Sequence, residues 1–75
     1  MKLIPYDAAT PKEYLVNQLH IHCDSGWEMS KTMHEIDYWC RNTQDTGTIV
    51  WTSQAYTITL WFEKAKYRTW FELTR

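Results

Sequence analysis

The chain has 75 residues, a formal net charge of −1, 44% hydrophobic residues and only two Gly and two Pro. This composition excludes an intrinsically disordered chain and predicts a single compact domain over residues 1–75, near the lower size limit for a stable core. The near-neutral charge argues against a nucleic-acid binder held by bulk electrostatics, because such proteins usually carry a basic excess.

The two cysteines, Cys23 and Cys40, are fewer than a small secreted scaffold normally has, so we expect reduced thiols. The first residues lack the pattern of a signal peptide, and no apolar run approaches the roughly 20 residues that a membrane span needs. The sequence therefore predicts a cytoplasmic protein that does not contact a membrane.

The first predicted element is a short strand or arm over residues 2–6. Pro5 lacks a backbone donor, which places this segment at a sheet edge. A helix is then predicted over residues 11–23, because Thr10 and Glu13 have the spacing of a capping box. The apolar residues that this helix would carry on one face are Leu15, Val16, Leu19 and Cys23.

Residues 24–43 allow two interpretations. Ser25 and Glu28 repeat the capping-box spacing, and a helix would align the apolar stripe Met29, Met33, Ile36 and Cys40. Gly26 followed by Trp27 is also typical of the end of a helix, after which a strand would carry Trp27, Met29 and Met33 on one face. The four-member stripe favours the helix.

The C-terminal half predicts three strands, over residues 48–53, 56–62 and 67–74. A turn at "EKAK" (63–66) separates the last two. The predicted fold class is therefore α+β, with one or two N-terminal helices packed on one face of a C-terminal three-stranded antiparallel meander.

The last hairpin has a definite register if residue 62 pairs with residue 67. Its core face, packed under the first helix, would carry Tyr56, Ile58, Leu60, Phe62, Tyr67, Phe71 and Leu73. On the reverse face Trp61 would lie opposite Arg68, a favourable cation–π pair, with Trp70 diagonal to Trp61. Three interpretations of these Trp residues stay open: other parts of the chain cover them, they pack sideways on neighbouring stems, or they form a recognition surface.

Residues suited to chemistry are few. His20, Cys23 and Asp24 are weak candidates for a metal site, since a helix would place these residues on one face at i, i+3 and i+4. His34 or Cys40 would be a further ligand. No nucleophile has an evident base and orienting group, and no glycine loop could cradle a phosphate. We therefore expect no cofactor, no metal and no enzymatic activity.

The preferred functional hypothesis is a small protein-binding module that inhibits or modulates a larger protein or complex, like many phage accessory or anti-defence proteins. Trp and Arg are typical anchors at such interfaces. The predicted partner-binding residues are Trp61, Arg68, Trp70, Lys64 and Lys66. A homodimer through the same face is a variant of this hypothesis. The alternatives are a single-stranded nucleic-acid-binding protein that stacks bases on these Trp residues and a zinc-stabilised module.

Overall fold

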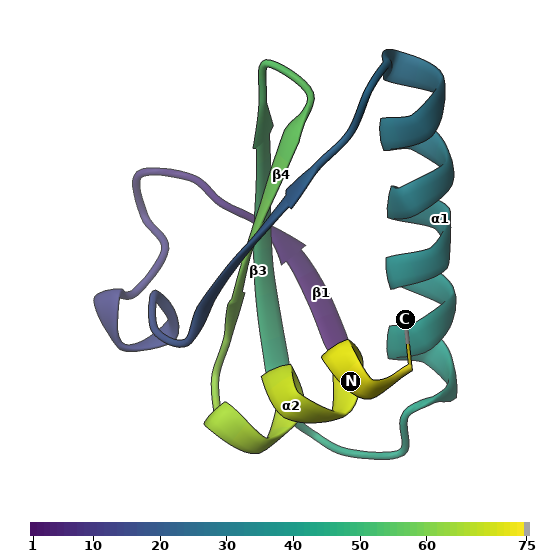
Figure 1. Cartoon of the computed structure of the whole chain (residues 1–75). Helices are drawn as coiled ribbons and strands as arrows, with labels where there is room; N and C mark the ends of the chain where they lie inside the picture. The colour runs from purple at the N-terminus through teal and green to yellow at the C-terminus, as the bar shows by residue number, and fades with distance from the viewer. Residues whose placement is uncertain (75) are drawn as a thin grey trace.

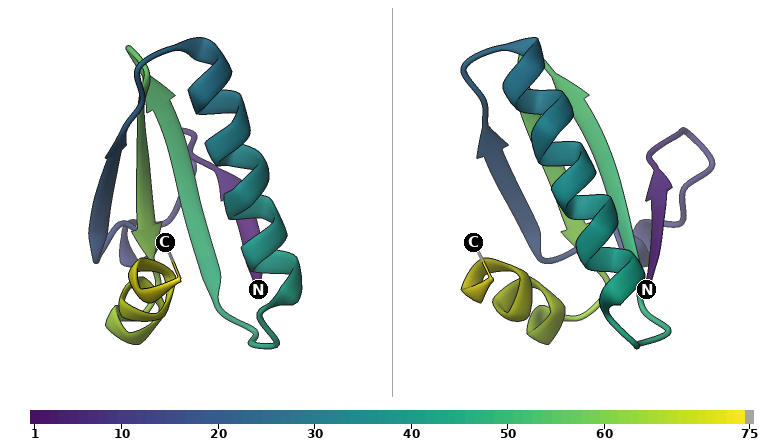
Figure 2. Two further views of the ribbon diagram at one scale, coloured as in Figure 1. Left: turned by 45° about the vertical axis from the view of Figure 1, so that its right-hand side comes forward. Right: turned by 90° about the vertical axis from the view of Figure 1, so that its right-hand side faces the viewer.

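The computed structural model describes residues 1–74, which form two α-helices and a four-stranded mixed sheet. The long helix α1 lies along one face of the sheet, and the short helix α2 lies at one end of it (Figures 1 and 2). In chain order the elements are β1 (Lys2–Pro5), the 3-10 turn η1 (Lys12–Tyr14), β2 (Gln18–His22), α1 (Gly26–Asn42), β3 (Thr48–Gln54), β4 (Thr57–Phe62) and α2 (Ala65–Leu73). The α+β class is confirmed, but the three-stranded antiparallel meander is wrong.

The sheet has the strand order β1-β3-β4-β2. β3 and β4 form an antiparallel hairpin, β2 pairs antiparallel with β4, and β1 pairs parallel with β3. The hairpin turn lies at Ala55 and Tyr56, whose φ angles of 50° and 63° are those of a tight type I′ connection. The prediction of an N-terminal strand at a sheet edge is confirmed.

The helix predicted over residues 11–23 is wrong. Thr10 does not cap a helix, because its Oγ1 accepts a hydrogen bond from the Asp7 amide at 2.9 Å and closes a local turn. Only the single 3-10 turn η1 follows, and Asn17, with a φ of 52°, reverses the chain into β2. In β2 the apolar Leu19 and Ile21 alternate with polar residues, so the period is two rather than 3.6.

The helix predicted within residues 24–43 is confirmed as α1, and its strand alternative is wrong. Ser25 is the N-cap, and its Oγ accepts a hydrogen bond from the Glu28 amide at 3.2 Å. The predicted stripe packs on the sheet: Ile36 and Cys40 are buried, and Met29 and Met33 pack against the core.

The turn predicted at residues 63–66 and the strand predicted over 67–74 are wrong, because residues 65–73 form α2. Tyr67 and Phe71, one helical turn apart, are both buried, and Arg68 pairs with Glu72 in the same i,i+4 spacing. The place beside β4 that this strand would have taken belongs to β2.

The core lies between one face of the sheet and the two helices. Its buried hydrophobic residues are Ile36, Cys40, Ile49, Ile58, Leu60, Phe62, Tyr67 and Phe71. Five predicted core residues, Ile58, Leu60, Phe62, Tyr67 and Phe71, are confirmed. Tyr56 and Leu73 are exposed instead, one in the hairpin turn and one at the end of α2.

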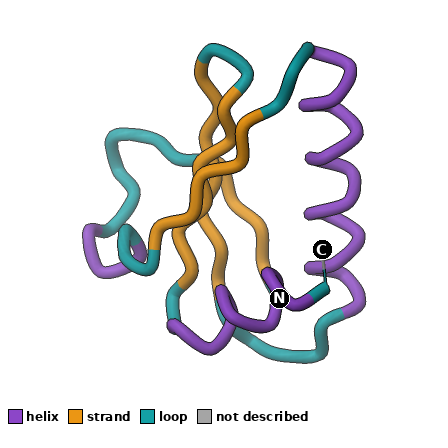
Figure 3. Tube along the Cα trace, in the orientation of Figure 1, coloured by secondary structure: helices purple, strands orange, loops and turns teal. Residues whose placement is uncertain are grey.

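Within residues 1–74, the opposite face of the sheet, which we call the outer face, is covered at one end only. The segment that contains η1 lies on this side, away from α1 (Figure 3). Tyr6 lies against Trp61 there, with ring centroids 5.7 Å apart. The other end of the outer face carries the polar residues of β2 and β4, including His20 and His22, whose side chains are exposed.

Candidate functional site

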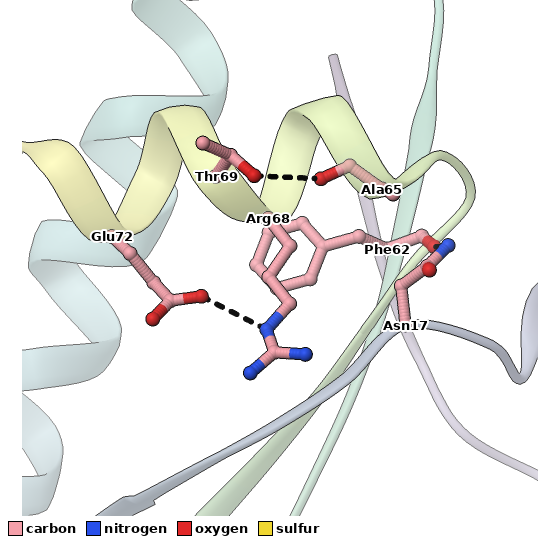
Figure 4. Close-up of polar contacts among 6 residues, drawn as sticks. All are labelled: Asn17, Phe62, Ala65, Arg68, Thr69 and Glu72. Carbon is pink, nitrogen blue, oxygen red and sulfur yellow. Dashed lines mark hydrogen bonds and ion pairs between the residues drawn. The ribbon is translucent and has the colours of Figure 1, made fainter.

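The five predicted partner-binding residues do not form one surface. Trp61 lies on the outer face of the sheet, half-buried beside Tyr6. Arg68 lies on α2 and forms a 2.9 Å ion pair with Glu72 (Figure 4) instead of meeting Trp61. Because α2 packs its Phe71 against Phe62 on the core face, α2 and Trp61 lie on opposite sides of the sheet.

The predicted stacking platform for single-stranded nucleic acid is therefore not formed. It required Trp61 and Trp70 on one face of a hairpin, and the helical conformation of residues 65–73 removes that hairpin. The same change explains why the predicted Trp61–Arg68 cation–π pair is wrong.

Three of the five residues do come together at α2, whose N-cap residue is Lys64. The Lys66 ammonium lies 5.3 Å from the Trp70 ring centroid and 5.5 Å from that of Tyr67, and the Lys64 ammonium lies 5.9 Å from the Tyr67 ring. Trp70 is 42% exposed, and its ring centroid is 5.8 Å from that of Tyr67. We call Lys64, Lys66, Tyr67 and Trp70 the α2 cluster.

The weak metal candidates are also separated. His20 lies on the outer face, where its Nδ1 is 3.0 Å from the Thr59 Oγ1. Cys23 packs against the core on the other side, and its Sγ is 3.9 Å from the Thr32 Oγ1. Within residues 1–74 there is no group of three or more His, Cys, Asp or Glu residues that could hold a metal ion.

Both cysteines are free thiols. Cys40 is buried in the core, and this burial raises the pKa of its thiol to about 11. At neutral pH the thiol of Cys40 therefore stays protonated and is a poor nucleophile.

The outward face of α1 carries a surface that the sequence analysis missed. Trp27 is 77% exposed and Tyr38 is 71% exposed, an unusual degree of exposure for two large aromatic side chains. The five residues that share this helix face, at spacings of four, three, four and three, are Trp27, Lys31, His34, Tyr38 and Arg41. We call them the α1 stripe, and it is about 21 Å long at 1.5 Å per residue.

The α1 stripe lies opposite the part of α1 that packs on the sheet. Successive residues turn by about 100°, so Trp27 and Tyr38 lie roughly half a turn from Ile36. Ile36 is fully buried, which fixes the α1 stripe as the side turned to solvent. The spacing of these five residues is visible in the sequence, but it indicates a shared helix face only once residues 26–42 are known to form one helix.

Two hollows flank Tyr38. One, of about 600 Å³, lies between α1 and α2 and is lined by Glu35, Tyr38, Trp39, Asn42, Thr43, Phe71 and Thr74. Its apolar wall includes the rings of Trp39 and Phe71, which meet edge to face with centroids 5.3 Å apart. The other, of about 630 Å³, runs along α1 and is lined by Lys31, His34, Glu35, Asp37, Tyr38 and Arg41. Tyr38 therefore forms a ridge between an aromatic hollow and a charged one.

The charges near the α1 stripe are mixed. Arg41 forms a 2.9 Å ion pair with Asp37, and Glu35 lines both hollows. Such exposed ion pairs contribute little to folding, about 0–1 kcal/mol, so these charges are available to orient another molecule.

Comparison of the chain with protein-family models, with curated proteins and with solved structures gives no match. Within residues 1–74, no helix is both long enough and apolar enough to cross a membrane.

Proposed function

We propose that this chain is a small non-enzymatic protein-binding module that inhibits or modulates a larger protein or complex, and that the α1 stripe is its contact surface. The observation that carries the proposal is the exposure of Trp27 and Tyr38 on one face of a single helix. Trp, Tyr and Arg are the residues most enriched at the centres of protein interfaces.

The scaffold suits this role because the α1 stripe is held rigidly. α1 is capped by Ser25 and is anchored on the sheet by Ile36 and Cys40. A preformed helix face loses little conformational entropy on binding, since only side chains need to be ordered.

The partner surface that fits the α1 stripe has two features. It offers apolar recesses for the rings of Trp27 and Tyr38, about 16 Å apart along the helix. It also places a carboxylate between them, opposite Lys31. An acidic groove in a partner protein meets both requirements.

The proposal is tested by capture from cell lysate with matched baits. We expect the wild-type chain to retain a partner that a Trp27→Ala/Tyr38→Ala bait loses. Each hot-spot truncation costs about 2 kcal/mol or more, which is roughly a 30-fold weaker Kd. Binding of the purified partner to each variant, measured by calorimetry, gives the size of the loss.

The matched control is Trp70→Ala, which removes an exposed indole from the α2 cluster. Circular dichroism of all three chains checks that each variant is folded. Retained binding by Trp70→Ala and loss with the α1 variant support the proposal. The reverse result would move the contact surface to α2 and refute the role of the α1 stripe.

A further inference from the structure

Two histidines on the outer face of the sheet are arranged as a pair. His20 and His22 are two residues apart on β2, so the strand geometry turns both side chains to the same face. Their rings are nearly parallel, with an interplanar angle of 16°, and their centroids lie 6.5 Å apart, about two strand residues. The helix predicted from the sequence would have turned the two rings apart.

Each ring is held in place by a threonine of β4. The Nδ1 atoms of His20 and His22 lie 3.0 Å from the Oγ1 atoms of Thr59 and Thr57, respectively. When Nδ1–H donates to the hydroxyl oxygen, the lone pair of the neutral imidazole is on Nε2. A hydrogen bond that fixes one ring nitrogen in this way is the usual support of a metal-ligating histidine.

The β2 strand of one chain contributes two imidazoles to this pair, whereas zinc is normally held by four ligands. β2 is an outermost strand of the sheet, so its free side can accept a further strand. The amide of Cys23 donates to Tyr56, and the carbonyl of Asn17 accepts from Phe62, both residues of the chain segment that contains β4. In an antiparallel ladder the bonding direction alternates, so the backbone groups of Gln18, His20 and His22 face the free side.

We propose that a divalent transition-metal ion, zinc in the first place, joins two copies of this chain through their β2 edges. In antiparallel pairing centred on Ile21, His20 of one copy lies opposite His22 of the other. Directly hydrogen-bonded partners have Cα atoms about 5.5 Å apart, and residues two apart on a strand are about 6.6 Å apart. Four imidazoles then lie around one point on the outer face, and rotations of χ1 and χ2 that turn the four Nε2 atoms toward this point bring them to the roughly 2.0–2.1 Å that zinc requires.

The test is titration of the purified chain with ZnCl₂ at neutral pH, followed by calorimetry and by light scattering after size exclusion. We expect one zinc ion per two chains and a zinc-dependent dimer that dissociates with a chelator. His20→Ala and His22→Ala should each abolish both effects. His34→Ala is the matched control, because His34 is the third histidine of the chain and lies on the opposite side, on α1; it should behave as the wild type.

Thr59 gives a test of positioning. Thr59→Val removes the hydroxyl beside His20, and we expect it to weaken zinc binding by about 10-fold or more relative to the wild type. Thr59→Ser retains the hydroxyl and should bind zinc as the wild type does. A chain that stays monomeric at saturating zinc, or zinc binding that survives both histidine changes, would overturn the proposal. This inference is independent of the proposed function: Trp27→Ala should leave zinc binding intact, and His20→Ala should leave partner capture intact.

Discussion

Gly47 shows how closely a single residue can control the packing of this small core. A Cβ at this position would overlap the ring of Tyr67, which is fully buried beside it. An aromatic ring enclosed in the core cannot move aside without displacing α2, so the absence of a side chain at residue 47 is a packing requirement.

We therefore expect Gly47→Ala to destabilise the chain by about 1–3 kcal/mol, the usual cost of overpacking a core. For a domain of this size each kcal/mol lowers the Tm by about 4–8 °C. Thermal unfolding followed by circular dichroism measures the change.

The chain has only one other glycine, Gly26, which provides the control. A Cβ there would meet nothing closer than 3.8 Å, and Gly26 is the first residue of α1. Gly26→Ala should be neutral or slightly stabilising, because Ala favours a helix more than Gly does. Equal losses of stability in the two variants would contradict the packing explanation.

One hydrogen bond joins the α1–β3 loop to α2. The Tyr67 hydroxyl donates to the Asp45 carboxylate at 2.7 Å. This bond lowers the pKa of Asp45 below its ordinary value of 3.8 and raises the pKa of Tyr67 to about 12. The folded chain therefore favours the ionised carboxylate and the neutral phenol.

These pKa shifts predict that the folded chain loses stability at low pH and at high pH. The contribution of Asp45 is present above pH 3.8 and is lost as the pH falls through the lower pKa of the folded chain. The contribution of Tyr67 is present below pH 10 and is lost as the pH rises through about 12. We expect the difference in unfolding free energy between the wild type and Asp45→Asn to shrink below pH 3.8, as measured by urea denaturation. A difference that stays constant down to pH 2 would show that this carboxylate is not coupled to folding.

The elements differ in how far the sequence predicts them. α1 and the β3–β4 hairpin were predictable from local signals: the Ser25 cap, the stripe ending at Cys40, and a β-branched run around Ile49. β2 was not, because Leu19 and Cys23 fit a helical stripe while Leu19 and Ile21 fit a strand. The strand is favoured over the helix by its pairing with β4, in which His20 lies opposite Thr59. No local sequence pattern encodes this long-range contact.

α2 was missed for a related reason. Tyr67 and Phe71 are four residues apart, a spacing that fits both one face of a helix and alternate positions of a strand. The predicted common face of Trp61, Arg68 and Trp70 depended on this element: Arg68 and Trp70 lie on α2, away from Trp61. The Arg68–Glu72 spacing was a helical signal that the sequence analysis did not use.

Three surfaces of the molecule differ in chemical character. The core-facing side of the sheet is filled by the two helices, the outer face presents a polar histidine pair, and α1 presents exposed aromatic rings. We propose partner binding at α1 and metal-dependent pairing at the β2 edge. The two roles use opposite sides of the molecule and can operate together.

The most direct test of the assigned contact surface is hydroxyl-radical footprinting of the chain with and without its captured partner, read out by mass spectrometry. We predict that oxidation of Trp27 and Tyr38 falls strongly in the complex, while oxidation of Trp70 and Tyr56 stays unchanged. Unchanged oxidation of Trp27 and Tyr38, with protection of Trp70 instead, would place the contact surface on α2.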